Sequence, residues 1–150
     1  MQRIYSDTSV IGGVVDPEFK EWSLILLDGF LKGDMILVLS DATIKELIDA
    51  PVEVHNKLSL IPKQNIELVH TTDNALKLAQ LYIDEKAISQ KFKVDALHIA
   101  LSTLNKVDIL VSWNFKHIVN IVRIRSYNSV NLRNGYIQVE IRTPREVFNE

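Results

Sequence analysis

Four side chains with oxygen donors occupy positions in this sequence from which they can converge on one site. Asp7 and Asn114 each follow a short apolar run, whereas Glu46 and Asp95 lie in segments with helical periodicity. Ligands of a parallel α/β sheet bind in the crevice beyond the carboxyl ends of its strands, so polar side chains near those ends are expected there. The set therefore predicts a cluster of three carboxylates and one amide.

The chemistry that uses such a cluster is metal-assisted hydrolysis of a phosphodiester. Mg²⁺ and Mn²⁺ prefer oxygen ligands, which are usually a few carboxylates together with waters and phosphate oxygens. Carboxylates held together in an apolar crevice raise one another's pKa, and a divalent cation relieves that repulsion. The bound cation activates a water molecule as the nucleophile and stabilises the charge that develops on the leaving oxygen.

Each of these residues also has a purely structural interpretation. Asp95 is of a type that caps helices well, and Asp7 fits a turn at the end of its strand. Glu46 fits a solvated helix position, with Asp49 as an equally acidic neighbour on the next turn. Asn114 is a common turn former. Only the order and environment of all four residues together favour a site.

The elements that must position these residues alternate between short apolar runs and longer helical patterns. The apolar runs are predicted strands, and they cover Arg3–Ser6, Met35–Leu39, Ile66–His70, Asp108–Ser112 and Ile137–Ile141. The alternation predicts an α/β fold with four to five strands in a parallel sheet.

Capping residues and apolar stripes mark the predicted helices. Asp16 is the expected N-cap, with Pro17 at the first position, of a helix that ends at Lys32 before Gly33. The other predicted helices run from Ser40 or Asp41 through Leu47, over Val52–Ile61, from Thr72 through Tyr82, over 93–104 and over Ile121–Arg133, with short helical turns after Trp113 and from Pro144.

The composition is that of one soluble globular domain, which we expect to span residues 1–150. Its 17 basic and 19 acidic residues give a formal net charge of −2, and 47% of the residues are hydrophobic. The absence of cysteine excludes disulfide scaffolds, thiolate metal sites and cysteine nucleophiles, which favours the reducing cytoplasm. No apolar run approaches the roughly 20 residues of a membrane helix, and the N-terminus does not read as a secretory signal, so no membrane partner is expected.

Charge is distributed unevenly along the chain. Residues 113–150 carry six basic and three acidic side chains, whereas residues 1–112 carry 11 basic and 16 acidic ones. Five of the six arginines lie in the C-terminal segment, at positions 123, 125, 133, 142 and 145. Because the planar arginine fork suits phosphate, this segment is a candidate nucleic-acid surface, and an ordinary solvated surface is the plainer alternative.

Two histidines stand near the carboxylates in the sequence. His98 follows Asp95 by one helical turn, so a general-base role is conceivable. His117 and Lys116 stand next to Asn114, where a cation could touch substrate phosphate, and a solvated helix start explains them equally well. No glycine-rich loop joins a strand to a helix, which argues against a nucleotide-binding domain.

The four residues and their surroundings resemble the PIN domain, the family named after the PilT N-terminus. The segments that carry the resemblance are Asp7-Thr8-Ser9, the helix with Glu46, Asp95-Ala96-Leu97-His98-Ile99-Ala100 and Ile109-Leu110-Val111-Ser112-Trp113-Asn114. The resemblance extends from residue 3 to about residue 145. It implies a three-layer α/β/α sandwich with a Mg²⁺- or Mn²⁺-dependent endoribonuclease site. Asp7, Glu46 and Asp95 match the family's acidic positions, and Ser112 matches its small hydroxyl residue.

Small stand-alone members of this family include VapC-type toxins, which implies RNA as substrate, a cognate antitoxin as partner and frequently a homodimer. Asn114 departs from the family pattern, which usually has an aspartate there. Its carbonyl oxygen can still bind a cation or orient a water molecule, although it contributes no charge. We therefore predict Asp7, Glu46, Asp95 and Asn114 as the catalytic, metal-binding residues. The alternative is a weak or silent PIN-like module that binds RNA or a protein.

Overall fold

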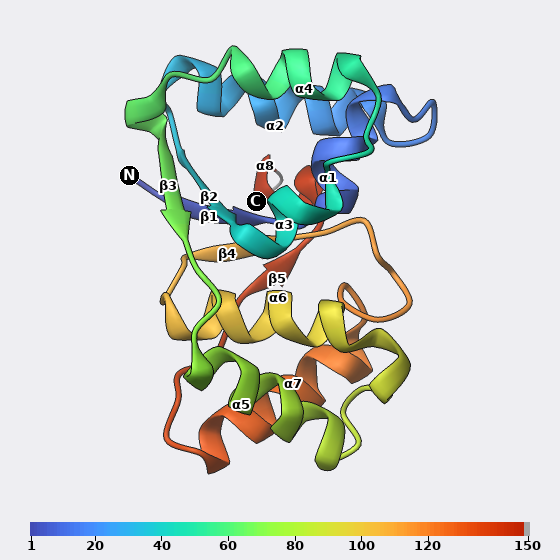
Figure 1. Ribbon diagram of the computed structural model, residues 1–150, viewed down its shortest axis with the longest axis vertical. Coiled ribbons are helices and arrows are strands. Elements are labelled where there is room, and N and C mark those ends of the chain that lie inside the picture. Colours follow the sequence, from blue (N-terminus) through green and yellow to red (C-terminus); the bar gives the residue numbers. More distant parts are fainter. Residues whose placement is uncertain (149–150) are drawn as a thin grey trace.

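The computed structural model describes residues 1–148, which form a five-stranded sheet between two layers of helices (Figure 1). All paired strands are parallel, and their order is β3-β2-β1-β4-β5. The strands are β1 (Arg3–Ser6), β2 (Ile36–Ser40), β3 (Ile66–Val69), β4 (Ile109–Val111) and β5 (Ile141–Arg142). The predicted three-layer α/β fold is confirmed, and β1 lies at the centre of its sheet.

The helices between these strands include most of those expected from the sequence. They are α1 (Thr8–Gly12), α2 (Lys20–Lys32), α3 (Asp41–Glu46), α4 (Val52–Ser59), α5 (Asp73–Asp84), α6 (Lys93–Leu104), α7 (Ile121–Arg133) and α8 (Pro144–Phe148). Ser40 caps α3 and Thr72 caps α5 through their side-chain oxygens, as predicted. None of the helices in residues 1–148 has the length and apolar character needed to span a membrane.

Alternation along the central strands divides the core between the two faces of the sheet. Ile4 and Ile109 pack on the face covered by α1, α2 and α4, whereas Tyr5 and Leu110 pack on the face covered by α5, α6 and α7 (Figure 1). Successive side chains of a strand point to opposite faces, so a strand buried on both faces is apolar along its whole length. This burial explains the continuous apolar runs in the sequence.

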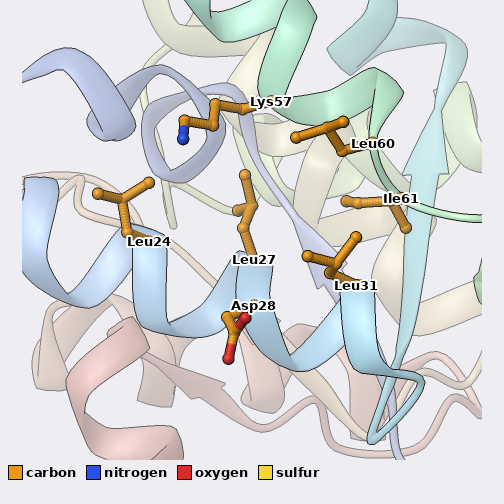
Figure 2. Close-up of a pocket in the computed structure, with 7 residues that line it drawn as sticks. All are labelled: Leu24, Leu27, Asp28, Leu31, Lys57, Leu60 and Ile61. Carbon is orange, nitrogen blue, oxygen red and sulfur yellow. The ribbon is translucent and has the colours of Figure 1, made fainter.

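A small pocket lies between α2 and α4, together with the turn that follows α4 (Figure 2). Its volume is about 120 Å³, and its lining is mostly leucine and isoleucine. The residues that line it are Leu24, Leu27, Asp28, Leu31, Lys57, Leu60 and Ile61. None of the four predicted site residues belongs to this pocket.

The first long helix begins later than predicted. α2 starts at Lys20, because the predicted N-cap Asp16 belongs to a tight turn. The Asp16 side chain accepts a hydrogen bond from the Glu18 backbone N–H at 2.8 Å, and its carbonyl accepts one from the Lys20 N–H at 2.8 Å. The sequence analysis also did not predict α1 or the 3₁₀ turn at Gly13–Val15 that follows it.

The last strand is also shorter than predicted. Residues 137–140 lie outside β5, because Asn128 of α7 binds both backbone groups of Val139. The Asn128 side-chain oxygen accepts from the Val139 N–H at 2.8 Å, and its amide donates to the Val139 carbonyl at 3.2 Å. The short helix expected after Trp113 is a turn in the structure.

Close packing around Gly13 gives a test of this fold. A Cβ at Gly13 would lie 2.6 Å from Ser23 Oγ and 3.2 Å from Trp113 Nε1, and these two buried groups are hydrogen-bonded to each other at 2.9 Å. Gly13→Ala is expected to lower the free energy of unfolding by ~1–3 kcal/mol, because the buried pair must move. Gly12→Ala is the matched control, since nothing lies within 4 Å of its Cβ position. Equal urea midpoints for the two variants would contradict this packing.

Candidate active site

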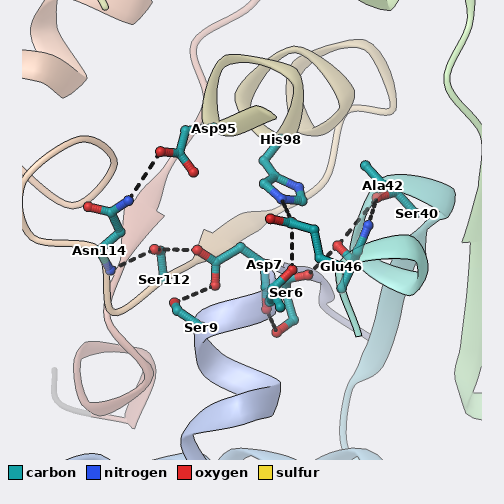
Figure 3. Close-up of polar contacts among 12 residues, drawn as sticks. Ser6, Asp7, Ser9, Ser40, Ala42, Glu46, Asp95, His98, Ser112 and Asn114 are labelled. Carbon is teal, nitrogen blue, oxygen red and sulfur yellow. Dashed lines mark hydrogen bonds and ion pairs between the residues drawn. The ribbon is translucent and has the colours of Figure 1, made fainter. Parts of the chain in front are cut away.

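Asp7 lies at the carboxyl end of β1 and caps α1, with its carboxylate almost completely buried (Figure 3). Its Oδ1 accepts hydrogen bonds from the Ser9 hydroxyl at 2.7 Å and from the Val10 backbone N–H at 3.2 Å. Its Oδ2 accepts a hydrogen bond from the Ser112 hydroxyl at 2.6 Å. Burial raises the pKa of Asp7 above its ordinary value, although His98 and these donors oppose the rise.

Glu46 is the last residue of α3, and its side chain is 39% exposed. One carboxylate oxygen, Oε1, accepts a hydrogen bond from the Thr8 hydroxyl at 2.7 Å and lies 2.7 Å from Nε2 of His98. Burial raises the pKa of Glu46, but the contacts with His98 and Thr8 outweigh burial, so the pKa lies below its ordinary value. Glu46 is therefore ionised at neutral pH.

Asp95 lies in the first turn of α6, whose N-cap is Phe92. Asp95 is therefore not the cap of its helix. The pKa of Asp95 is raised to about 6, first by burial and then by the negative charges of Asp7 and Glu46, against an opposing effect of His98. The three predicted carboxylates thus lie near enough to repel one another.

The amide of Asn114 meets Asp95 through its nitrogen. Nδ2 donates to Asp95 Oδ2 at 3.3 Å, whereas Oδ1 accepts from the backbone N–H groups of Lys116 and His117 at 3.2 and 2.9 Å. Reversal of the amide would set its NH₂ group against two N–H donors, so this hydrogen-bond pattern fixes its orientation. Asn114 closes the turn after β4, and its side-chain oxygen is committed to the backbone.

A buried chain of polar side chains supports Glu46 from the interior (Figure 3). His98 is 1% exposed; its Nδ1 lies 2.7 Å from the Tyr5 hydroxyl, which lies 2.7 Å from the Ser40 hydroxyl. The family resemblance implies a packing or supporting role for His98, but the sequence does not identify its partners. The one available signal was Ser40, the single polar residue of β2, together with the hydroxyl of Tyr5 in β1.

The donor set fits a hard divalent cation in its chemistry. The available donors are carboxylate oxygens, and the repulsion that raises the pKa of Asp95 is what a cation relieves. Within residues 1–148, no three His, Cys, Asp or Glu side chains are arranged as a group that could already hold a metal ion. Binding of a cation therefore requires the carboxylates to draw together, and the ligand roles of Asp7, Glu46, Asp95 and Asn114 stay predictions.

A cleft of about 600 Å³ adjoins Glu46. It is lined by Glu46 together with Ala42, Lys45 and Asp49 from the region of α3, and by Val94 and Leu97 from α6. The cleft is open on one side of Glu46, whereas His98 lies on the buried side. Glu46 thus stands between the interior of the protein and a space in which a substrate group can lie.

The C-terminal arginines are largely engaged in contacts within the chain. Arg123 donates to the Ala87 carbonyl at 2.9 Å, and the Arg145 guanidinium lies 5.8 Å from the centre of the Trp22 ring. Two others form ion pairs, Arg133 with Glu85 and Arg142 with Glu140. These arginines therefore do not form a row of free cations, as a nucleic-acid face along this segment would require.

Two lysines and one of these arginines gather beside the site, and we call Lys91, Lys116 and Arg123 the basic cluster. They surround His117, whose pKa is lowered by burial and by these three positive charges. The His117 ring stacks on Phe92 with a centroid distance of 3.6 Å, and Lys91 lies 5.8 Å from the Phe92 ring centre. His117 also donates its backbone N–H to Asn114, and Asn114 in turn donates to Asp95. The basic cluster therefore lies beside the carboxylates.

Comparison with known proteins gives a match at the level of the fold. No protein-family model and no curated protein sequence matches this chain. The structure is similar to that of Mycobacterium tuberculosis VapC20, described as a toxin that cleaves the sarcin-ricin loop, with a TM-score of 0.59, 12% identity, and coverage of 91% of this chain and 98% of that one. It is also similar to VapBC2 from Rickettsia felis, bound to a DNA fragment from their promoter, with a TM-score of 0.59, 10% identity, and coverage of 95% and 98%. The predicted resemblance to VapC-type PIN domains is confirmed for the fold.

Removal of the Asp95 charge is expected to stabilise the metal-free protein at neutral pH. The pKa of Asp95 is about 6 in the folded protein against an ordinary value of 3.8, so the folded state binds more protons and loses stability as the pH rises through this window. Asp95→Asn should raise the free energy of unfolding by ~1–2 kcal/mol at pH 8, after allowance for solvent screening, and by almost nothing near pH 3.5. Urea denaturation in EDTA at both pH values measures the difference.

The matched control is Asp49→Asn, which neutralises an exposed carboxylate outside the polar network. It should change stability by less than ~0.5 kcal/mol at either pH. If the two substitutions had the same effect, or if the Asp95→Asn difference did not depend on pH, Asp95 would not be repelled by its neighbours.

Proposed function

We propose that this protein is a Mg²⁺- or Mn²⁺-dependent endoribonuclease, acting as a single domain and as the toxin of a toxin-antitoxin pair in the cytoplasm. The observation that carries the proposal is the gathering of Asp7, Glu46 and Asp95 at the carboxyl edge of a VapC-like sheet, where the charges of Asp7 and Glu46 raise the pKa of Asp95. VapC20, which has a similar fold, is described as cleaving the sarcin-ricin loop. The proposal transfers this class of reaction, hydrolysis of an RNA phosphodiester, to the present carboxylates.

Asp7, Glu46 and Asp95 would hold the cation, which when bound supplies an activated water and neutralises charge on the scissile phosphate. Ser9, Ser112 and the Val10 N–H fix the orientation of the Asp7 carboxylate. Asp95 has a pKa of about 6, so its proton leaves near neutral pH, and proton and cation compete for the same oxygens. Cleavage should therefore increase as the pH rises through about 6.

Asn114 contributes no negative charge to the proposed site. Its neutral amide donates a hydrogen bond to Asp95. To become a metal ligand, the Asn114 oxygen would have to give up its hydrogen bonds from two backbone N–H groups. A site with three carboxylates binds a divalent cation less tightly than one with four. This feature favours the second candidate function, a weak or silent module that binds RNA or a protein.

The proposed partners are RNA, a cognate antitoxin protein and a second copy of the chain. The antitoxin is supported by the similarity to VapBC2, whose structure is described with promoter DNA. RNA is supported by the basic cluster, which offers positive charge next to the carboxylates. The homodimer follows only from the family resemblance.

Single substitutions of the carboxylates test the ribonuclease directly. Asp7→Asn, Glu46→Gln and Asp95→Asn should each lower the rate of Mn²⁺-dependent cleavage of a mixed RNA pool by ~100-fold or more, because each removes one anionic ligand with little change of shape. Initial rates with Mn²⁺ and with EDTA provide the measurement. Glu53→Gln, at an exposed position on α4 outside the cleft, should keep the wild-type rate.

Two outcomes would overturn this assignment. Retained cleavage in all three variants would place the catalytic centre elsewhere. A wild-type protein that binds RNA but cleaves none of it with either cation would establish the silent module instead.

The basic cluster predicts where RNA lies. Lys91→Gln combined with Lys116→Gln should weaken binding of a single-stranded RNA and reduce the slope of log affinity against log salt by up to ~1.4, since each phosphate contact on a single strand contributes ~0.7. Lys57→Gln with Lys63→Gln is the charge-matched control, on and after α4. A slope that changes equally in both pairs would move the RNA surface away from the basic cluster.

A further inference from the structure

His98 is enclosed between the candidate active site and the core (Figure 3). Its Nε2 lies 2.7 Å from Glu46 Oε1, and its Nδ1 lies 2.7 Å from the Tyr5 hydroxyl. Both ring nitrogens are therefore engaged, and the side chain is 2% exposed. A general base must reach the proton of a water or substrate, which neither nitrogen of His98 can do in this position.

The hydrogen at the Glu46 end of this chain follows from geometry, and the others are assigned from the distances. Oε1 of Glu46 is an acceptor, because it receives the hydrogen of the Thr8 hydroxyl, so Nε2 of His98 carries a hydrogen and donates. At the other end, the Ser40 hydroxyl accepts from the backbone N–H of Thr43 at 3.1 Å. Its own hydrogen can go to Tyr5 at 2.7 Å or to the Thr43 hydroxyl at 3.3 Å, and we assign it to the shorter contact. The Tyr5 hydroxyl then donates to Nδ1 of His98 at 2.7 Å.

This assignment satisfies all groups of the chain with a single tautomer of His98. Tyr5 is fully buried, so its hydroxyl must find its acceptor among its neighbours. With the opposite tautomer, Nδ1 would donate to Tyr5, and Nε2 would present a lone pair to the carboxylate of Glu46. Two acceptors would then face each other at 2.7 Å.

We infer that His98 is the positioning residue for Glu46, held by Tyr5 in the tautomer that carries its hydrogen on Nε2. The inference rests on the proposed function and adds to it the residue that orients the Glu46 carboxylate. His98 and Thr8 both bind Oε1 of Glu46, which leaves Oε2 directed away from these donors and available to a divalent cation. A ligand oriented in this way by an outer partner binds a metal more tightly than a mobile one, typically by 10–100-fold.

Glu46 needs such a partner because of its place in the fold. It is the last residue of the six-residue helix α3, its side chain is 39% exposed, and it adjoins an open cleft. An exposed glutamate on the end of a short helix samples several rotamers, and the two contacts to Oε1 restrict it to one. His98 itself is fixed because α6 is buried along the face that carries it.

The tautomer can be measured in the metal-free protein. Long-range ¹H–¹⁵N spectra of protein labelled with ¹⁵N-histidine should give Nε2 of His98 the shift of a protonated nitrogen and Nδ1 that of an unprotonated one. Tyr5→Phe removes the donor to Nδ1 with one oxygen atom. Nε2 should stay protonated, because Glu46 still accepts its hydrogen, whereas the Nδ1 shift should move downfield toward that of an imidazole nitrogen without a hydrogen bond. A hydrogen on Nδ1 in the wild-type protein, or a spectrum unchanged in Tyr5→Phe, would overturn the inference.

Variants of His98 separate positioning from packing. His98→Gln places an amide N–H near the position of Nε2, whereas His98→Leu fills the space without a donor. Three-bond couplings of Glu46, measured without metal, should report one rotamer in the wild-type protein and in His98→Gln, and averaging in His98→Leu. Calorimetry should show Mn²⁺ affinity lower by ~10–100-fold in His98→Leu and largely recovered in His98→Gln.

The outcomes distinguish the inference from the proposed function. A wild-type protein that binds no Mn²⁺ and cleaves no RNA refutes the ribonuclease, while the tautomer and the Glu46 couplings still decide whether His98 positions Glu46. Equal couplings and equal Mn²⁺ affinities in His98→Gln and His98→Leu would show that His98 only fills space. If His98→Leu does not fold, Tyr5→Phe still tests the inference, because His98 and its packing remain in place in that variant.

Discussion

The repulsion among Asp7, Glu46 and Asp95 is the constraint on which the rest of this site depends. Burial disfavours their charges, and the charges of Asp7 and Glu46 raise the pKa of Asp95. The fold compensates with hydrogen-bond donors directed at the carboxylates, which are the hydroxyls of Thr8, Ser9 and Ser112, the backbone N–H of Val10, the imidazole of His98 and the amide of Asn114. This compensation is incomplete at Asp95, whose pKa stays raised to about 6 despite its donor.

The parallel sheet makes this concentration of charge possible. β1 lies at the centre of the sheet with β2 and β4 on either side, so the segments that leave these three strands start at one edge. Asp7 follows β1 directly, α3 with Glu46 follows β2 directly, and Asn114 follows β4 after two residues. Asp95 comes instead from α6, which packs across the face of the sheet, and its carboxylate reaches the same edge from that face. Charge is thus brought together by topology, while the core beneath it stays apolar on both faces.

The sequence predicted the features that depend on local pattern. Apolar runs identified the strands, and caps at Ser40 and Thr72 identified helix starts. The sequence also singled out three carboxylates, Asp7 and Glu46 by their places after strands and Asp95 by its place at the start of an apolar helix, and their role as a site stays a prediction. The sequence analysis failed where a side chain far away in the sequence forms a hydrogen bond with a backbone group or with another side chain. Asn128 holds the backbone of Val139 and so delays the last strand. The hydrogen bond between Tyr5 and His98 joins residues 93 positions apart, and no periodicity in one chain encodes such a pair.

The geometry of Asn114 gives a physical meaning to its departure from the family pattern. A carboxylate at this position would present only acceptors, and Asp95 would face a fourth negative charge at hydrogen-bond distance. The two ends of the Asn114 amide instead have different partners. Its oxygen accepts hydrogen bonds from the backbone of the turn, and its nitrogen donates to Asp95. Asp95 is thereby held in place without a metal ion, and the site contains one charge less to be neutralised. Asparagine in place of aspartate therefore stabilises the metal-free arrangement and would weaken the attraction of the proposed site for a cation, and both effects arise from the same missing charge.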